Sequence, residues 1–525
     1  AQARRLGDDA EAGLRAAERD LLGAVEEDPS DVEARLALAG FELDRGAPDK
    51  AAAALAPVAA AAASDPRVVD AQARAMAAQG RVLDAMNLID AALGRAPGDA
   101  RLLTAKGLVL AQSGKRAEAE KLWADAAARD PRGWEPHLLL GRAALARGDV
   151  EAAARPIQLA VERAPAEAEA VVGSADLLLA RKDLPAAEAG YRRALSLDPA
   201  EARALVGLSR VALARGDSAS ARASLERALR LDSGLGQAQA LLGELAWKAG
   251  DLPGARKALA AAVALDPSDA WARARLGAVE LDQREIDAAI TDLLAASNME
   301  MGSAEIRVWL GRALLAKNDL PPAAEQLRKA VELDPGNGRN HLLLGQVLER
   351  QNALAEAAES YRTAQARAPD LVEAWEAMAS LLASQNRCAD ALKQLERAVA
   401  LAPREQRLRV AQGDCEMRLG RPEAAIALYR RALDADPRQR GLAFKIGRAA
   451  HEASGMKDAL PWYERAAREE PPEPMAWYYL GFAYKDRNQR ARAVEAFKTY
   501  LAKKPDADDR TDIEREIEDL GGRVR

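Results

Sequence analysis

The chain has 525 residues, of which 49% are hydrophobic but only 4% aromatic, so alanine supplies much of the apolar fraction. Its 75 basic and 81 acidic residues give a net charge of -6, which argues against nucleic acid or an anionic membrane as the main partner, because both need a net basic face. Two cysteines exclude a disulfide-built or multi-zinc scaffold. The Ala-rich uncharged run 51–64 is shorter than the roughly 20 apolar residues of a transmembrane segment.

The N-terminal segment, residues 1–29, is predicted to contribute only the second helix of a first structural unit. It ends at Pro29, which is in phase with prolines that recur later in the chain. The chain starts with alanine rather than methionine, so we interpret it as a processed or trimmed piece. Its composition, rich in alanine and arginine, is typical of bacterial proteins, and cytoplasm and periplasm both stay open as compartments.

Residues 30–505 carry an internal repeat of 34 residues, and such a period defines the fold. After the Ala-rich stretches, prolines in one phase stand at Pro97, Pro131, Pro165, Pro199, Pro267, Pro335, Pro369, Pro403, Pro437, Pro471 and Pro505. Twelve residues before the end of each unit there is always an alanine, at Ala17, Ala51, Ala85, Ala119, Ala153, Ala187, Ala221, Ala255, Ala289, Ala323, Ala357, Ala391, Ala425, Ala459 and Ala493. We expect these alanines to be buried where helices meet.

Each unit is predicted to be a pair of antiparallel helices. A second small residue, usually glycine, recurs 24 residues before the end of the unit. A bulky residue such as Trp123, Tyr361 or Phe497 stands eight residues before the same end. Small residues let the helices approach closely, and the bulky one fills the remaining space. Glycine or asparagine near the middle of the unit ends the first helix in a left-handed cap. Each pair exposes an apolar face that only the next pair can cover, which predicts an all-α solenoid.

This pattern resembles the tetratricopeptide repeat family, over about 15 tandem units from the N-terminus to Pro505. The resemblance implies a right-handed superhelix whose first helices line a concave groove, where a protein or peptide segment usually docks. Pentatricopeptide RNA-binding proteins have a similar hairpin, but their 35-residue unit and the acidic charge balance of this chain argue against that class.

In the resembling family, two positions of each first helix point into the groove. In this chain these positions are apolar: Leu138 and Leu145, Val172 and Leu179, Val206 and Leu213, Ala240 and Trp247, Ala274 and Leu281, Val308 and Leu315. An exposed apolar strip usually marks a binding surface, although the side chains could also be shaded by their neighbours. A charged column between them is expected to pair neighbouring helices, through Arg142, Asp176, Arg210, Glu244, Asp414 and Arg448.

Aromatic residues are concentrated near the C-terminus, where 10 of the 20 fall between residues 444 and 500. Phe444, Tyr478 and Phe482 are predicted to face the groove, close to Arg448 and Lys485. Aromatic and arginine side chains together are typical of binding hot spots. This region is therefore a second candidate for contact with a partner.

No catalytic motif is present, so we expect neither an enzyme nor a bound cofactor or metal. His137 and His341 share one repeat position and are expected to pack inside helix pairs, whereas His451 stands on the presumed inner face. Cys388 and Cys415 lie on neighbouring helices, and we interpret them as buried free thiols, a disulfide being the alternative.

The last segment, residues 506–525, drops the repeat pattern and is predicted to form a helix that covers the final unit. Taken together, the sequence predicts a non-catalytic scaffold that binds a protein or peptide in its concave groove. The alternative is a periplasmic module of a polysaccharide-export or envelope-assembly system. The sequence gives no indication of the oligomeric state.

Overall fold

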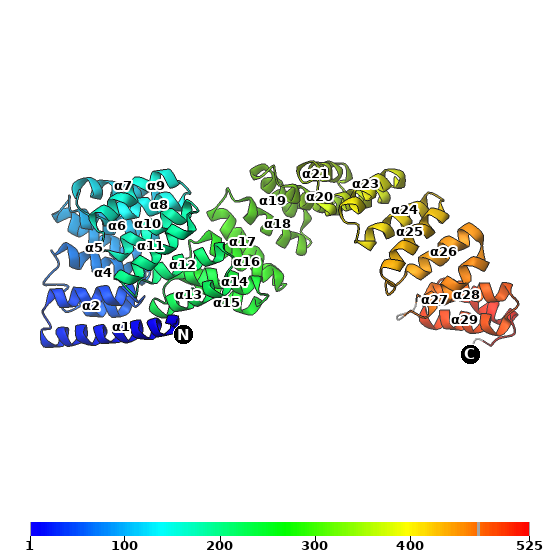
Figure 1. Cartoon of the computed structure of the whole chain (residues 1–525), viewed down its shortest axis with the longest axis horizontal. Coiled ribbons are helices and arrows are strands. Elements are labelled where there is room, and N and C mark those ends of the chain that lie inside the picture. Colours follow the sequence, from blue (N-terminus) through cyan, green and yellow to red (C-terminus); the bar gives the residue numbers. More distant parts are fainter. Residues whose placement is uncertain (1, 470–472, 524–525) are drawn as a thin grey trace. The chain divides into compact units, whose positions relative to one another are not determined.

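The structure is a computed structural model that describes residues 2–469 and 473–523, with side chains from residue 12 onward. Within these ranges the chain forms 30 α-helices and no β-strand (Figure 1). Their bounds are α1 Gln2–Glu27, α2 Val32–Asp44, α3 Pro48–Leu55, α4 Pro66–Ala78, α5 Val82–Arg95, α6 Ala100–Gln112, α7 Arg116–Arg129, α8 Glu135–Ala146, α9 Val150–Arg163, α10 Ala168–Ala180, α11 Leu184–Leu197, α12 Ala202–Ala214, α13 Ser218–Leu231, α14 Gly236–Lys248, α15 Leu252–Leu265, α16 Ala270–Asp282, α17 Ile286–Met299, α18 Ala304–Ala316, α19 Leu320–Leu333, α20 Gly338–Arg350, α21 Leu354–Arg367, α22 Val372–Ser384, α23 Cys388–Leu401, α24 Gln406–Arg418, α25 Pro422–Ala435, α26 Leu442–Ser454, α27 Met456–Ala467, α28 Pro474–Asp486, α29 Arg490–Lys503 and α30 Arg510–Asp519.

Residue contacts divide the chain into two compact units, residues 1–301 and residues 302–525, which we call unit 1 and unit 2. Inside each unit the helices follow one another as hairpins joined by short turns and stack side by side as a solenoid (Figure 1). None of the helices in the described part of the chain is long and apolar enough to cross a membrane.

The recurring alanine marks the joint of each helix pair. From Ala51 to Ala493, all fourteen of these residues are completely buried, whereas Ala17 on α1 is partly exposed. The register predicted from the repeat is therefore confirmed. Pro471 lies outside the described residues.

The small and bulky positions also pair as predicted. A Cβ atom added to Gly107 would lie 2.3 Å from the Trp123 ring, and one added to Gly345 would lie 2.4 Å from the Tyr361 ring. Real Cβ atoms essentially never approach a neighbour this closely. The missing side chain of the first helix is therefore the space into which the ring of the second helix fits.

The first helices end in a left-handed residue, as predicted at Gly114 and Asn318, whose φ angles are 83° and 65°. Lys182 and Arg284 adopt the same conformation, with φ of 62° and 66°, although neither is glycine or asparagine. A side chain with a Cβ atom is disfavoured there because Cβ crowds the following carbonyl oxygen. The repeat geometry overrides the local preference of these two residues.

The N-terminal helices return to a distant part of unit 1. Leu14 of α1 packs against the buried cluster that contains Leu225 and Leu231 of α13. The turn after α2 touches the turn after α13, where a Cβ atom on Gly46 would lie 3.0 Å from the backbone nitrogen of Gly234. Segments more than five repeats apart in the chain thus lie side by side.

The C-terminal helix α30 packs against α29, and its Ile513 and Ile517 are buried in the cluster formed with the last helix pair. The other helix neighbours in unit 2 follow the same hairpin order as those in unit 1.

Candidate functional site

The inner side of unit 1 contains a cavity of about 1090 Å³. Its walls come from α1, α2 and α4, from the N-terminal ends of α6, α8, α10 and α12, from turns that precede these ends, and from the C-terminal ends of α11 and α13. Its apolar lining consists of Leu14, Leu36, Phe41, Leu43, Trp134, Leu197 and Leu231. The cavity exists because the N-terminal helices return to α13.

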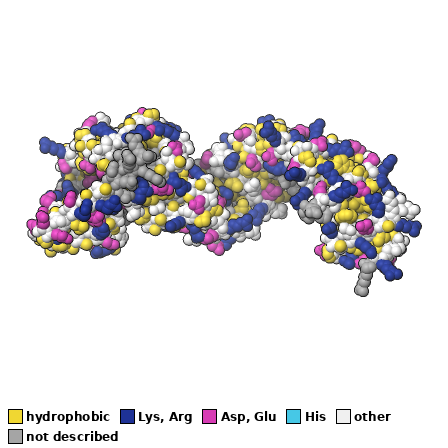
Figure 2. All heavy atoms as spheres, turned by 60° about the horizontal axis from the view of Figure 1, so that its bottom comes forward, with side chains coloured by type: hydrophobic (Ala, Val, Ile, Leu, Met, Phe, Trp, Pro, Cys, Tyr) yellow, Lys and Arg dark blue, Asp and Glu magenta, His cyan; other side chains and the backbone are white. Residues whose placement is uncertain are grey.

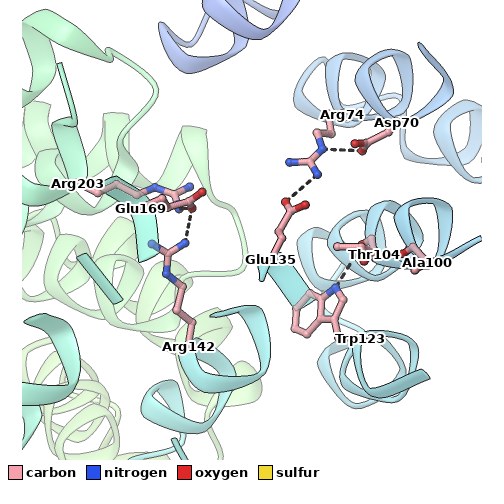
Figure 3. Close-up of polar contacts among 9 residues, drawn as sticks. All are labelled: Asp70, Arg74, Ala100, Thr104, Trp123, Glu135, Arg142, Glu169 and Arg203. Carbon is pink, nitrogen blue, oxygen red and sulfur yellow. Dashed lines mark hydrogen bonds and ion pairs between the residues drawn. The ribbon is translucent and has the colours of Figure 1, made fainter. Parts of the chain in front are cut away.

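One ion-pair network in this cavity joins helices that are not neighbours in sequence. Arg74 of α4 donates from Nε to Asp70 at 2.6 Å and from Nη2 to Glu135 of α8 at 2.8 Å (Figure 3). Arg74 and Glu135 are 61 positions apart in the chain, and the whole of α5, α6 and α7 lies between them. Burial raises the pKa of Glu135 in spite of Arg74, so its carboxylate is poorly hydrated.

A second network centres on Glu169 at the start of α10. Figure 3 shows Arg142 and Arg203 converging on this carboxylate from two sides, at 2.5 and 2.8 Å. Burial works to raise the pKa of Glu169, but the two arginines outweigh it and hold the pKa below the ordinary value. Glu169 is therefore a fixed negative charge in the wall.

Other carboxylates of the cavity have no basic side chain within 4 Å among the described residues. They are Asp44, Glu167, Asp198, Glu201 and Asp232. The Asp44 side chain reaches the water of the cavity, yet limited hydration raises its pKa to about 6, and Glu169 and two further acids add to the rise. Burial also raises the pKa values of Glu201 and Asp232.

The charges that line the cavity are unbalanced. Among the residues whose side chains the structure describes, nine carboxylates and five guanidinium groups face it. No group of three or more His, Cys, Asp or Glu side chains in the described residues has the arrangement of a metal site. The described side chains therefore give the cavity a net negative charge.

The sequence-predicted strip is only partly available to a partner. Leu138 is 1% exposed and lies under α10, because a Cβ atom on Gly173 would stand 2.3 Å from its Cδ1. The same position is buried in the next units, at Val172, Val206, Ala240 and Ala274. The expectation that Leu138 faces the groove is wrong, because this position packs between successive first helices.

The other strip position is half-buried, at Leu145, Leu179, Leu213, Trp247, Leu281 and Leu315. The first five belong to unit 1, and Leu315 belongs to unit 2. Trp247 is tied to the next first helix, because its Nε1 donates to Asp282 at 2.7 Å. None of these residues lines the cavity, which lies at the opposite, N-terminal ends of the first helices.

Two members of the charged column join neighbouring first helices as expected, but with partners outside the column: Arg142 of α8 pairs with Glu169 of α10, and Asp414 of α24 pairs with Lys445 of α26 at 2.5 Å. Asp176 and Asp414 accept hydrogen bonds from Tyr191 and Tyr429 within their own helix pairs, at 2.7 and 2.8 Å. Arg142 pairs with Glu169 rather than with Asp176. The buried tyrosine hydroxyl needs an acceptor, and the carboxylate of the same helix pair supplies it.

The C-terminal aromatic residues form one connected surface in unit 2. Phe444, Tyr478 and Phe482 are half-buried, while Arg448 and Lys485 are exposed. Tyr478 contacts Phe482 with ring centroids 5.0 Å apart, and Phe482 contacts the buried Phe497 at the same distance. Sequence reasoning missed Tyr479, which stacks on the buried Tyr463 at 5.0 Å with an interplanar angle of 7°. We use the name aromatic patch for the surface formed by Phe444, Arg448, Tyr478, Tyr479, Phe482 and Lys485.

The remaining candidates are structural. Cys388 and Cys415 are free and buried, and burial together with the neighbouring Cys388 raises the pKa of the Cys415 thiol to about 12, which makes it unreactive. His341 is buried beside the carbonyl of Pro335, and burial lowers the pKa of His137.

These observations define an all-helical repeat protein of the class built from stacked antiparallel helix pairs. The sequence model of the tetratricopeptide repeat family matches residues 71–132, 104–168, 172–236, 240–298, 275–338, 310–371, 376–440 and 444–508. The chain therefore belongs to the tetratricopeptide repeat family. Proteins of this family bind protein partners in general and are generally non-catalytic.

Solved structures give similar folds. The chain resembles a protein in the Cut9–Hcn1 hetero-tetramer of the APC/C, with 14% identity, a TM-score of 0.45 and coverage of 85% of this chain and 95% of that chain. It also resembles YrrB, described as a TPR protein with an unusual peptide-binding site, with 26% identity, a TM-score of 0.30 and coverage of 37% and 97%. The C-terminal part of a repeat protein from Cytophaga hutchinsonii matches with 14% identity, a TM-score of 0.41 and coverage of 46% and 98%. No curated protein matches the sequence.

Proposed function

We propose that the chain is a non-catalytic scaffold that binds an extended, basic segment of a partner protein on its inner surface, with the cavity of unit 1 as the main site. The observation that carries this proposal is the cavity itself, at about 1090 Å³. Pockets for small molecules usually measure about 300 to 1,000 Å³. A cavity above that range accommodates several residues of a peptide.

The charge of the cavity supports a basic segment. The five carboxylates without a basic partner lie at the end of α2 and in three successive turns between repeats, so they form a series along one wall. A lysine or arginine of the partner supplies the missing positive charge, and the apolar side chains beside them contact its aliphatic stem. The ion pairs of Arg74 and Glu169 hold the rest of the wall in place.

The half-buried strip and the aromatic patch remain proposed as further contact surfaces of the same scaffold. The envelope-assembly role has no support over this general role.

A charge-deletion variant tests the proposal. The variant Asp198→Asn, Glu201→Gln and Asp232→Asn keeps the side-chain acceptors that these residues offer to backbone N–H groups but removes three charges. We expect a fluorescent 12-residue peptide containing two lysines to bind the wild-type chain at least about tenfold more tightly than this variant. A matched control neutralises Glu118, Glu151 and Glu226, which are exposed on second helices. Equal binding by the cavity variant and the control would reject the cavity as the site.

A further inference from the structure

Four helix pairs have tyrosine at the bulky position, and each of these rings is buried. Three of the hydroxyls donate to a carboxylate on the first helix of the same pair: Tyr191 to Asp176 at 2.7 Å, Tyr361 to Glu349 at 2.6 Å, and Tyr429 to Asp414 at 2.8 Å. Asp176 and Asp414 occupy the same repeat position, and Glu349 stands three residues further along its helix. The fold thus has two places from which a carboxylate reaches this hydroxyl.

The fourth tyrosine, Tyr463 in α27, has no such acceptor. In its partner helix α26, Arg448 occupies the position of Asp176 and Asp414, and His451 occupies the position of Glu349. The hydroxyl of Tyr463 is buried and has no hydrogen-bond partner among the described residues. Native proteins rarely leave a buried donor in this state, so the group calls for an explanation.

The surroundings of Tyr463 favour a negatively charged ligand group. Arg448 is exposed, and the ion pair that it forms within the described part of the chain is with Glu452 of its own helix, with Nη2 and Oε1 3.2 Å apart. His451 lies edge-on to Tyr479, with ring centroids 5.9 Å apart. Burial raises the pKa of Tyr463, so its hydroxyl keeps the proton and acts as a donor. Arg448 with its partner Glu452, His451 and the Tyr463 hydroxyl therefore lie around one place. In the three related helix pairs, a carboxylate occupies the corresponding place and accepts the hydrogen bond of the tyrosine.

Apolar contact surface adjoins this place. Phe444, one turn before Arg448, lies 5.9 Å from the Tyr463 ring and 6.0 Å from the Tyr479 ring, measured between centroids. Tyr478 and Phe482 continue the surface on the next first helix, α28, and rest on the buried rings of Tyr500 and Phe497. Buried rings beneath them fix the half-buried rings in place, which lowers the entropy cost of binding.

We propose that the aromatic patch binds an acidic segment of a partner protein, whose aspartate or glutamate side chain takes the place of the carboxylate that Tyr463 lacks. The side chain pairs with Arg448 in exchange for Glu452 and lies beside His451. Because the Tyr463 hydroxyl has no exposed surface, the side chains that cover it turn aside so that it can donate to the same carboxylate. A neighbouring aliphatic or aromatic residue of the segment packs on Phe444, Tyr478 and Phe482. The inference rests on the proposed scaffold function only in taking the ligand to be a protein segment.

The binding test uses the full chain and the fluorescent, acetylated and amidated peptide Gly-Ser-Leu-Glu-Phe-Gly-Ser, with a second peptide that has Gln in place of Glu. Anisotropy titration is expected to show about tenfold tighter binding of the Glu peptide, since hydrogen bonds to a charged group are the strong ones. Arg448→Gln should abolish this preference, and Tyr463→Phe should reduce it to about threefold. Tyr429→Phe is the matched control, because its hydroxyl already has Asp414, and it should leave the preference unchanged.

Thermal melting separates a binding role of Tyr463 from a structural one. Tyr429→Phe removes a hydrogen bond and should lower the melting temperature, whereas Tyr463→Phe removes none and should not. A loss of stability in Tyr463→Phe equal to that in Tyr429→Phe would mean that the hydroxyl has an internal partner, and the proposal fails.

Further outcomes are equally decisive. Equal affinity for the Glu and Gln peptides, or an unchanged preference in Arg448→Gln, overturns the proposal. A Gln peptide with a free C-terminal carboxylate that binds as tightly as the Glu peptide shows recognition of a chain end instead. Failure of the lysine peptide at the cavity, with the Glu preference intact here, rejects only the cavity.

Discussion

The cavity of unit 1 and the aromatic patch of unit 2 are built from the same helix pair but have opposite chemistry. The cavity gathers carboxylates from turns that are far apart in the chain, and its charge exceeds what its arginines balance. The patch comes from two successive first helices and presents rings beside basic groups. On the face drawn in Figure 2, basic and acidic side chains are interspersed over both units. The repeat thus determines the backbone, whereas the side chains at a few variable positions determine the charge and polarity of each surface.

The largest expected effect concerns the anchors of the two surfaces. Tyr478→Ala should weaken binding of the acidic peptide by about 1 to 4 kcal/mol and leave the lysine peptide unaffected, because truncating a central aromatic residue exposes the pocket to water. Trp247→Ala should weaken binding of a partner that uses the strip to a similar extent. It should also lower the melting temperature, because the hydrogen bond to Asp282 is lost. Titration of Tyr478→Ala with both peptides checks the first effect. Trp247 lies in neither peptide site, so Trp247→Ala should bind both peptides as the wild type does, and loss of both peptides in either variant would break the comparison.

The second expected effect tests the joint that both units share. Ala289→Leu in unit 1 and Ala357→Leu in unit 2 should each lower the free energy of unfolding by about 1 to 3 kcal/mol, because both sites are fully buried between helices and have no room for three more carbon atoms. Urea unfolding followed by circular dichroism measures the loss. Tolerance of either substitution would contradict the repeat register in that unit.

A smaller effect is expected at the wall of the cavity. Glu169→Gln leaves Arg142 and Arg203 without their shared carboxylate, and we expect a loss of about 1 to 2 kcal/mol of stability, since the group is partly exposed and solvent screens the charges. A thermal melt at two salt concentrations checks the value. Asp176→Asn, which keeps an acceptor for Tyr191, is a control that should cost less.

The fourth prediction concerns pH at the cavity. With its pKa raised to about 6, Asp44 binds more protons in the folded than in the unfolded chain between about pH 4 and 6, so it contributes stability that is lost as pH rises through 6. Affinity for the lysine peptide should run the other way and grow about threefold from pH 5 to 7, as Asp44 becomes charged. Asp44→Asn should flatten both profiles around pH 6, and a wild-type profile without a step there would contradict the assignment.

The smallest effect concerns the turns inside the helix pairs. Lys182→Gly should stabilise unit 1 by about 0.5 to 1 kcal/mol, because glycine adopts a positive φ without the crowding of Cβ. This net figure already includes the opposing cost, which is the larger conformational entropy that glycine loses on folding. Gly216→Lys, the reverse change one repeat later, should destabilise by a similar amount. Differential scanning calorimetry resolves both, and an unchanged melting temperature in both variants would show that the fold accepts either residue.

The sequence predicted the solenoid because its pattern is local: a 34-residue period, an alanine at every joint, and glycine opposite the bulky ring all act within one helix pair or its neighbour. The cavity was missed because it depends on curvature, which brings Arg74 to Glu135 and Gly46 to Gly234. A signal was nevertheless present, since Arg67, Arg101, Glu135, Glu169 and Arg203 share one repeat position. Whether Leu138 is exposed or shaded by its neighbours stayed open for a related reason, because the repeat period does not specify the distance between successive first helices.

Because Gly46 contacts Gly234, the cavity can form only with the present number of repeats between these two residues. Solenoids usually gain and lose whole modules by gene duplication and deletion at little cost, because every junction is interchangeable. Here, one module inserted or removed between α2 and α13 would keep each junction intact but separate two backbones that now meet without room for a side chain. Natural variants that change the module count in this stretch would keep the fold and lose the enclosure, whereas changes in count after α13 would leave the enclosure unaltered.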